Sequence, residues 1–239
     1  MTVPDIVTAD LARLSITLSA DQLTQLDVYL THLLETNKTM NLTAIREVDA
    51  AWRRLIIDSL TAVPMLDDVP TGSKMIDVGS GGGLPGIPLA IARPDLHVTL
   101  LETTGKKAKF LESCVKIVGL KNVTVVQARA ETAGQDPAHR QKYDAAICRA
   151  VGPMRELLEC CLPLVKLGGV VLAMKGPKAE DELDESGDAL MALGGGEIQV
   201  IEAYPEEFKI DTVIVRITKE HATPKAYPRA PGMPRQAPL

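Results

Sequence analysis

Asp77-Val78-Gly79-Ser80-Gly81-Gly82-Gly83-Leu84-Pro85-Gly86 is the stretch that decides the fold of this chain. It follows the short apolar run Lys74-Met75-Ile76, and the apolar pattern of residues 84–92 after it predicts a helix. Glycines between a strand and a helix let the backbone turn tightly and approach a ligand, because they carry no Cβ atom. Several classes of cofactor-dependent enzyme use such a loop, so it predicts a cofactor site without identifying the cofactor.

Composition limits the class of protein. The chain has 239 residues, 46% of them apolar and only 3% aromatic, which predicts one large aliphatic core, with room for a helical extension. The net charge of −5 argues against coating nucleic acid through bulk charge, although a local basic patch is compatible with it. The N-terminus has no signal-peptide pattern, and no apolar run reaches the roughly 18 residues of a membrane helix. We therefore expect a cytoplasmic protein.

Other kinds of catalytic site have no support in the sequence. The cysteines form no C-x-x-C pair and the four histidines are scattered, so we expect buried, reduced thiols and no metal site. The chain also lacks a G-x-S-x-G elbow and a P-loop lysine motif. No catalytic acid, base or nucleophile can be assigned, which suits a cofactor that is already activated, such as a sulfonium methyl donor.

The chain divides into three parts. Residues 1–66 have leucines at helical spacing and are expected to form a helical extension. Residues 67–222 alternate short apolar runs with helical patterns, which predicts a mostly parallel sheet covered on both faces. Residues 223–239 are Pro-rich and basic, and we expect a mobile or extended tail that contacts phosphate or is simply a frayed end.

The expected elements of the middle part can be given by their ranges. Strands are predicted at 74–78, 97–101, 123–127, 143–148 and 169–174, with helices at 84–92, 106–118, 153–164 and about 179–193. Two later β-rich runs, 198–204 and 212–218, have a short connection and are expected to pair antiparallel at the far edge of the sheet.

Polar residues at the predicted strand ends indicate which cofactor the loop holds. Glu102 closes the second strand, and a carboxylate there can accept two hydrogen bonds from a ribose diol, as NAD and S-adenosylmethionine enzymes require. Ala130-Glu131 follows the third strand, where an adenine ring would rest, and Arg149 follows the fourth, where it could reach a carboxylate or a phosphate. Asp77 before the glycines, and the lack of a hydride-transfer pair, disfavour a nicotinamide oxidoreductase.

Segments along nearly the whole chain match one family. They are Asn41-Leu42-Thr43-Ala44-Ile45, Ile57-Asp58-Ser59-Leu60, the run from Ile76 through Gly83-Leu84-Pro85-Gly86-Ile87-Pro88-Leu89, Leu100-Leu101-Glu102 with Lys106-Lys107, Arg129-Ala130-Glu131, Arg149-Ala150, Lys175-Gly176, and Thr223-Pro224-Lys225-Ala226-Tyr227-Pro228-Arg229 with Gly232 and Pro234. In these segments the chain resembles the bacterial 16S ribosomal RNA guanine-N7 methyltransferases, also known as glucose-inhibited division protein B. One departure is Leu55, where many members have histidine.

The resemblance implies a class I methyltransferase fold, which is Rossmann-like with a seven-stranded sheet, and S-adenosylmethionine as cofactor. By position, the family's cofactor contacts fall on Gly79, Leu84, Glu102, Thr103, Thr104, Ala130, Glu131 and Arg149. The implied reaction is methylation of N7 of a guanine in 16S ribosomal RNA, free or in the small subunit, by a protein that we expect to be a monomer. The alternatives are a methyltransferase of a small molecule or protein, and a non-catalytic ribosome-assembly factor.

Overall fold

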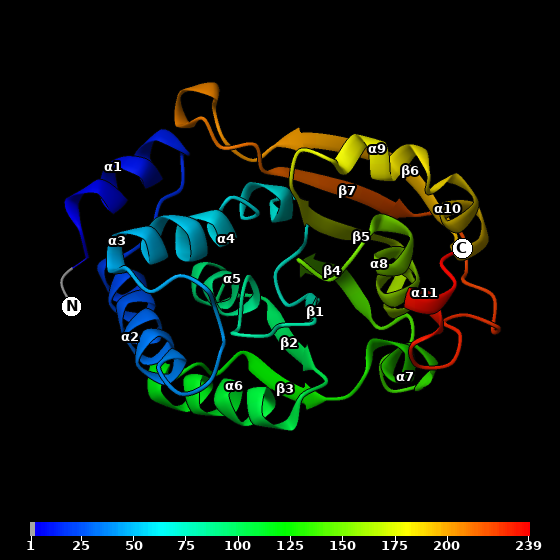
Figure 1. Ribbon diagram of the computed structural model, residues 1–239, viewed down its shortest axis with the longest axis horizontal. Coiled ribbons are helices and arrows are strands. Elements are labelled where there is room, and N and C mark those ends of the chain that lie inside the picture. The colour runs from blue at the N-terminus through cyan, green and yellow to red at the C-terminus, as the bar shows by residue number, and fades with distance from the viewer. Residues whose placement is uncertain (1–2) are drawn as a thin grey trace.

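Seven strands form a single sheet in the computed structural model of the protein, which describes residues 3–239 (Figure 1). The sheet order is β3-β2-β1-β4-β5-β7-β6; β1 to β5 are parallel, and β7 runs antiparallel to both of its neighbours. The strands are β1 (Lys74–Val78), β2 (His97–Glu102), β3 (Val123–Gln127), β4 (Tyr143–Arg149), β5 (Val165–Lys175), β6 (Gly195–Glu202) and β7 (Val213–Lys219). The predicted mostly parallel sheet with an antiparallel edge is confirmed.

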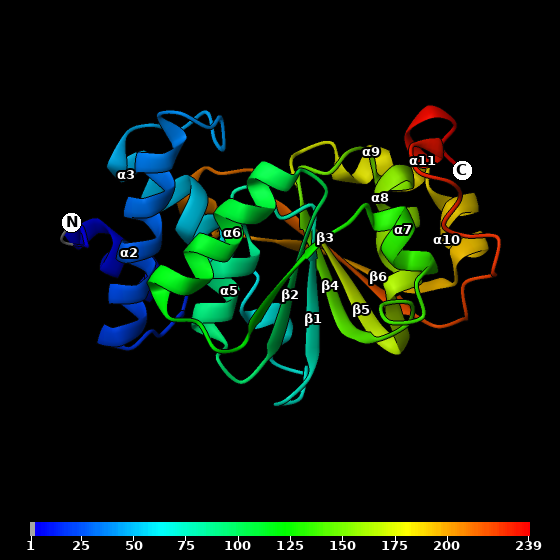
Figure 2. The same ribbon diagram turned by 90° about the horizontal axis from the view of Figure 1, so that it is seen from below.

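Helices cover both faces of the sheet, as Figure 2 shows. One layer contains α5 (Gly86–Ala92) and α6 (Gly105–Val118), and the other contains α7 (Ala130–Gln135), α8 (Met154–Cys161), α9 (Ala179–Asp184) and α10 (Gly187–Leu193). Side chains of β1 alternate between the two layers: Met75 belongs to the core beneath α5 and α6, whereas Ile76 and Val78 belong to the core beneath α8. Burial on both faces explains why these strands read as continuous apolar runs.

Helix boundaries differ from the predicted ones where the chain turns. The helix predicted at 179–193 is two helices, because residues 185 and 186 turn the chain between α9 and α10. The helix predicted at 153–164 ends as α8 at Cys161, and a 3₁₀ turn (Leu162–Leu164) with Pro163 inside it leads into β5. A proline has no N–H to continue the α-helical hydrogen bonds, which explains this change.

The helical extension packs outside α5 and α6. It comprises α1 (Asp5–Arg13), α2 (Ala20–Asn37), α3 (Val48–Ala51), a π-helical segment (Trp52–Ile57), α4 (Asp58–Leu60) and a 3₁₀ turn (Pro64–Leu66); residues 1 and 2 of the predicted extension lie outside the described residues. Ser19 caps α2: its hydroxyl accepts from the amide of Gln22, whose side chain accepts from the amide of Ser19. Apolar side chains of α2 and the π-helical segment, including the fully buried Trp52, continue the core of this layer.

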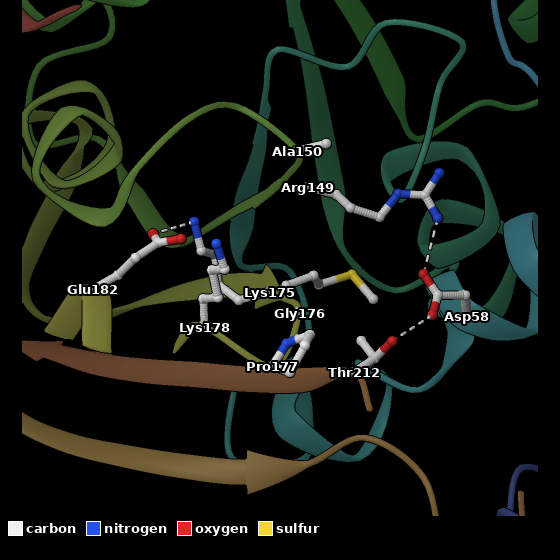
Figure 3. Close-up of a pocket in the computed structure, with 10 residues that line it drawn as sticks. Asp58, Arg149, Ala150, Lys175, Gly176, Pro177, Lys178, Glu182 and Thr212 are labelled. Carbon is white, nitrogen blue, oxygen red and sulfur yellow. Dashed lines mark hydrogen bonds and ion pairs between the residues drawn. The ribbon is translucent and has the colours of Figure 1, made fainter. Parts of the chain in front are cut away.

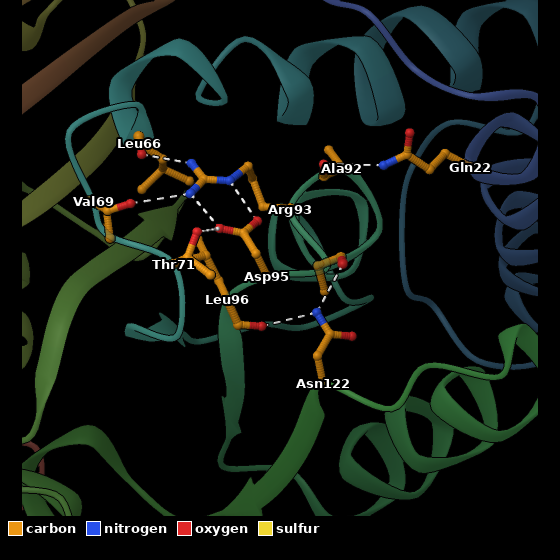
Figure 4. Close-up of polar contacts among 10 residues, drawn as sticks. Gln22, Leu66, Val69, Thr71, Ala92, Arg93, Asp95, Leu96 and Asn122 are labelled. Atoms are coloured by element: carbon orange, nitrogen blue, oxygen red, sulfur yellow. Dashed lines mark hydrogen bonds and ion pairs between the residues drawn. The ribbon is translucent and has the colours of Figure 1, made fainter.

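Polar contacts fasten the extension to the sheet layer (Figure 4). Gln22 donates to the carbonyls of Ile91 and Ala92 at the end of α5. Arg93 donates to the carbonyls of Leu66 and Val69 and forms an ion pair with Asp95 (2.8 Å). These contacts satisfy carbonyl groups that a helix end and a turn leave without partners.

The tail from Thr223 to Leu239 packs against α7 and α8, so the prediction of a mobile or extended tail is wrong. Arg229 forms an ion pair with the fully buried Glu159 of α8 (2.6 Å), and its amide donates to the same carboxylate. Arg140 donates to carbonyls of the tail, and α11 (Met233–Gln236) lies against α8. The tail has no apolar periodicity, and polar partners far away in the sequence, Glu159 and Arg140, hold it in place. Local sequence patterns do not reveal contacts of this kind.

Candidate functional site

The glycine loop between β1 and α5 is built by close contacts that only glycine permits. A Cβ atom on Gly83, whose φ is +92°, would lie 2.5 Å from Cδ1 of Ile87. On Gly86 it would lie 2.4 Å from Cδ2 of Leu100 and 2.6 Å from Oδ2 of Asp77. The buried Tyr29 of α2 donates to the carbonyl of Gly82 (2.6 Å), so the helical extension also holds the loop. The loop is therefore a rigid wall at the carboxyl end of the sheet.

Asp77 lies beneath this loop and is fully buried. Its Oδ2 accepts from the amide of Gly86 (3.0 Å), which fixes the first turn of α5, and its Oδ1 has no partner among the described residues. Burial raises the pKa of Asp77 to about 7, although hydrogen bonds from Ser80 and Gly86 oppose the shift. The side chain thus supports the loop from below.

Glu102 joins the loop to the next helix. It is 6% exposed at the end of β2, where one oxygen accepts from the amide of Gly81 (2.9 Å) and the other from the amide of Thr104 (2.7 Å). Two backbone bonds orient the carboxylate and leave lone pairs on both oxygens for further donors. Thr103 is exposed beside it, with its hydroxyl against the carbonyl of Ala128. The structure therefore brings Gly79, Glu102, Thr103 and Thr104 together at the carboxyl end of the sheet. We call this end of the sheet, beside the glycine loop, the crevice, because ligands of open parallel sheets bind there.

Two other residues predicted to contact the cofactor, Glu131 and Leu84, are largely buried in the structure. Glu131, at the start of α7, accepts from the amide of Gly232 in the tail (2.7 Å) and is 8% exposed. The side chain of Leu84 is 7% exposed and packs in the core beneath α5 and α6. The predicted contacts of Leu84, Ala130 and Glu131 with a cofactor stay predictions, and the structure adds that the tail orients Glu131.

Arg149 reaches from the end of β4 into a pocket of about 490 Å³ beside the crevice (Figure 3). Its guanidinium donates to Oδ2 of Asp58 (3.0 Å), a residue of the helical extension. Oδ1 of Asp58 lies 3.3 Å from the hydroxyl of Tyr204 and 3.5 Å from that of Thr212. Burial, together with the carboxylate of Asp58, raises the pKa of Tyr204, so this hydroxyl remains a donor at neutral pH. The cation of Arg149 thus faces a carboxylate on the wall of the pocket.

The opposite wall of the pocket is fixed by Lys175 at the end of β5. Its ammonium group pairs with Glu182 (2.6 Å) and donates to the carbonyl of Gly152 (2.8 Å), as Figure 3 shows for the ion pair. Glu182 also accepts from the amide of Met154. The loop after β4 has an uncommon backbone conformation, because Ala150 has a φ of +56°. The contacts of Lys175 with Gly152 and Glu182 help to hold the loop in this conformation.

Sequence reasoning missed the second half of this site. Asp58 lies in one of the segments that resemble the family, but the sequence assigned it no function. No sequence pattern pointed to Tyr204, Thr212 or Glu182, because each becomes part of the pocket only through folding.

No group of three or more His, Cys, Asp or Glu side chains suited to a metal ion occurs within residues 3–239. All four cysteines are buried, and burial raises the pKa of Cys114 to about 12. Helices in the described chain are too short or too polar to cross a bilayer.

Comparisons with known proteins agree with this arrangement. The family model described as "rRNA small subunit methyltransferase G" matches residues 22–209. A protein named ribosomal RNA small subunit methyltransferase G from Moorella thermoacetica is 39% identical, over 94% of this chain and 93% of its own. One from Lactobacillus johnsonii is 40% identical, over 99% of both chains.

A solved structure extends the likeness to the fold. That of TYW2 from M. jannaschii in complex with AdoMet has a TM-score of 0.52 and 18% identity, covering 68% of this chain and 76% of its own. At this identity the likeness concerns the fold alone, whereas the family match spans most of the chain. The chain belongs to the rRNA small subunit methyltransferase G family.

Proposed function

We propose that this protein transfers the methyl group of S-adenosylmethionine to N7 of a guanine in 16S ribosomal RNA. The observation that carries the proposal is the adjacency of two half-sites at the carboxyl ends of the strands. One is the crevice of the glycine loop and Glu102, and the other is the pocket of Asp58 and Arg149. In an open parallel sheet this edge is where ligands bind. Family membership supports ribosomal RNA as the substrate.

The residues of the crevice fit the proposed cofactor. Glu102 is held by two backbone amides and keeps acceptor capacity for a ribose diol, and the glycine loop lets a ligand approach its backbone closely. Gly79, Thr103, Thr104 and the backbone of Leu84 would complete the binding surface. S-adenosylmethionine supplies an activated methyl group on a sulfonium centre, so the protein itself need not form a covalent intermediate.

The reaction at guanine N7 requires little acid–base chemistry from the protein. The nitrogen carries a lone pair and no proton at neutral pH, so it can attack without a general base. The purine gains a positive charge on transfer, and carboxylates in the neighbouring pocket stabilise that charge. Alignment of the base is the main task left to the chain.

We place the base in the pocket lined by Asp58 and Arg149. Guanine carries N–H donors on its Watson–Crick edge, and Asp58 is a carboxylate with acceptor capacity whose position is fixed by Arg149 and Tyr204. The cavity of about 490 Å³ lies in the range of small-molecule sites. Arg149 then serves to position Asp58, in addition to any contact with the cofactor.

Calorimetric titration of the purified protein tests the cofactor half of the proposal. Wild-type protein is expected to bind S-adenosylmethionine and not NAD. Glu102→Ala is expected to weaken binding roughly a hundredfold, because the variant loses the two hydrogen bonds that the buried carboxylate would accept from the ribose diol. Binding of NAD alone would contradict the proposal and indicate an oxidoreductase. Binding of neither ligand would favour a non-catalytic assembly factor.

Methyl transfer to unmethylated 16S ribosomal RNA, free and in small subunits, tests the substrate half. Asp58→Asn is expected to lower kcat/KM at least tenfold with an unchanged affinity for S-adenosylmethionine, because the crevice is intact. Asp49→Asn removes an exposed acid of the same extension and is the matched control, expected to be without effect. Methylation at a guanine atom other than N7, or of protein only, would overturn the assignment.

The monomeric state and the cytoplasmic location belong to the same proposal. Both half-sites are completed within one chain, which supports action as a monomer. Ribosomal RNA as the substrate supports a cytoplasmic location. Light scattering with and without RNA would contradict the first part if it showed a stable dimer.

A further inference from the structure

Two adjoining hollows lie at the amino-terminal end of the sheet, the end opposite the glycine loop. One, of about 330 Å³, is lined from the starts of β1 and β2, from β3 and from the loop before β4; the other, of about 400 Å³, continues past the end of α5. They share His97, Lys121 and Asn122, and we call their union the basic groove. Strands of five or six residues place it roughly 15–20 Å from the crevice.

The charge of the basic groove is of one sign. Lys74, Lys121 and Lys142 line it together with His97 and His139, and no Asp or Glu of the described chain lines either hollow. The whole chain carries 31 acidic and only 26 basic residues, so a lining without acids departs from its average surface. A cluster of this kind raises the local concentration of anions.

The three lysines are available for a ligand, whereas the acids nearby are occupied. Lys74, Lys121 and Lys142 are exposed, and their ammonium groups form no hydrogen bond or ion pair within residues 3–239. Asp144 pairs with Lys166 (2.5 Å) and accepts from the backbone of Lys74, and Asp95 pairs with Arg93. Asp136, near Tyr143, accepts from the amide of Ala138 and is the one acid beside the first hollow, among those that the structure describes, without an ion pair in it. Three lysines face this one carboxylate, so the groove keeps a net positive charge.

Hydrogen-bonding groups with fixed positions line the same groove. The ring of His139 stacks on Tyr143 and lies 2.7 Å from its hydroxyl. Asn122 donates to the carbonyls of Ala90 and Leu96, which holds the ridge between the hollows (Figure 4). Thr99 of β2 and Thr124 of β3 also line the first hollow. The groove thus combines exposed lysines with polar side chains that hydrogen bonds hold in place.

We propose that the basic groove binds the phosphodiester backbone of the RNA substrate at a place remote from the methylated base. The proposal rests on the proposed function. Its occupant is a strand rather than a single phosphate ion, because the lysines come from three separate segments and the two hollows adjoin at His97, Lys121 and Asn122. An acidic protein whose net charge opposes RNA gains a second anchor in this way, and the RNA contacts both ends of the sheet.

Salt-dependent binding of 16S ribosomal RNA tests the proposal. Lys74→Gln/Lys121→Gln/Lys142→Gln removes three charges while keeping flexible polar side chains, and Lys209→Gln, at an exposed lysine of the β6–β7 connection, is the control for loss of a lysine elsewhere on the surface. Each lost phosphate contact lowers the slope of log affinity against log salt by about 0.7 to 0.9, so the triple variant is expected to lose about 2 from the slope. We expect affinity to fall about tenfold, with KM raised and kcat kept.

Four results would contradict the proposal that the basic groove binds RNA. An unchanged salt slope in the triple variant would do so directly, provided that its thermal unfolding and its affinity for S-adenosylmethionine match the wild type. Inorganic phosphate that shifts the His97 and His139 resonances, with no effect of the variant on RNA, would identify an ion site. A defect with small subunits but not with free RNA would identify a ribosomal protein as partner. A wild-type protein that binds no RNA would overturn the proposed function as well.

Discussion

The crevice of the glycine loop and the pocket of Asp58 lie side by side but are built in opposite ways. In the crevice, Asp77 bonds Gly86 nine positions away, and Glu102 bonds Gly81 across 21. In the pocket, Asp58 meets Arg149, Tyr204 and Thr212 across 91, 146 and 154 positions. The first is built mainly from contacts within about 21 positions, in which carboxylates accept from backbone amides, with one longer contact from Tyr29. The second depends on the complete tertiary fold, and the difference predicts distinct responses to substitution.

The largest expected effect concerns a contact that is non-local, like those of the pocket. Arg229→Met leaves Glu159 buried without a cation, and breaking a buried ion pair in this way costs about 3–5 kcal/mol of unfolding free energy. Urea unfolding measures the change. In Glu159→Gln/Arg229→Met the carboxylate is also neutral, and most of the lost stability should return. A single variant within about 1 kcal/mol of the wild type would show that long-range contacts are not what holds this region.

The second prediction concerns Asp77 in the local region. Burial raises its pKa from 3.8 to about 7, so the folded state binds the proton more tightly than the unfolded state does. Its contribution to stability is full below pH 4 and is lost as the pH rises through 7, a change of up to about 4 kcal/mol. Urea unfolding at pH 5 and pH 8 should show this decline in the wild type, and Asp77→Asn should abolish it.

Asp95 is the control for that pH dependence. The hydrogen bond from Arg93 lowers the pKa of Asp95, so its contribution is lost only as the pH falls below the range tested. Asp95→Asn should therefore keep the decline between pH 5 and pH 8. An equal loss of the decline in both variants would assign it to another group.

The third prediction compares a glycine that is tightly packed, Gly86, with one that is not, Gly187. Gly86→Ala places a methyl group against Leu100 and Asp77 and should cost about 2 kcal/mol, together with a loss of cofactor affinity. Gly187 begins α10, and a Cβ there would meet nothing within 4 Å, so Gly187→Ala should stabilise the protein by up to about 1 kcal/mol. Thermal unfolding and calorimetry of both variants measure these changes, and equal costs would remove the argument for a tightly packed loop.

The smallest expected effect is that of the cap of α2. Ser19→Ala removes the acceptor of the Gln22 amide and should cost about 1 kcal/mol. Because the cap is far from both half-sites, kcat and cofactor affinity should remain those of the wild type. A catalytic defect would mean that α2, through Tyr29 and Gly82, transmits small shifts to the loop.

The sequence predicted the glycine loop between β1 and α5 and missed the pocket of Asp58 for the same physical reason. Apolar runs and glycines report local backbone geometry, so strands β1 and β3 were predicted with their observed bounds. Arg149 was identified at a strand end, but its carboxylate partner comes from a helix 91 positions earlier. The packed tail escaped prediction because Glu159 and Arg229 are charged residues, which patterns assign to the surface, and only their pairing allows burial.

The long separations around Asp58 have a consequence for the order in which the protein matures. Contacts between residues close in sequence can form early in folding, whereas those of high sequence separation form late. The hydrogen bonds of Asp77 and Glu102 need only residues 77–104, but Asp58 reaches its final surroundings only when β7 and the connection before it are in place. The surroundings of Asp58 are therefore among the last parts of the site to form, and the proposed base pocket is complete only when the whole chain has folded.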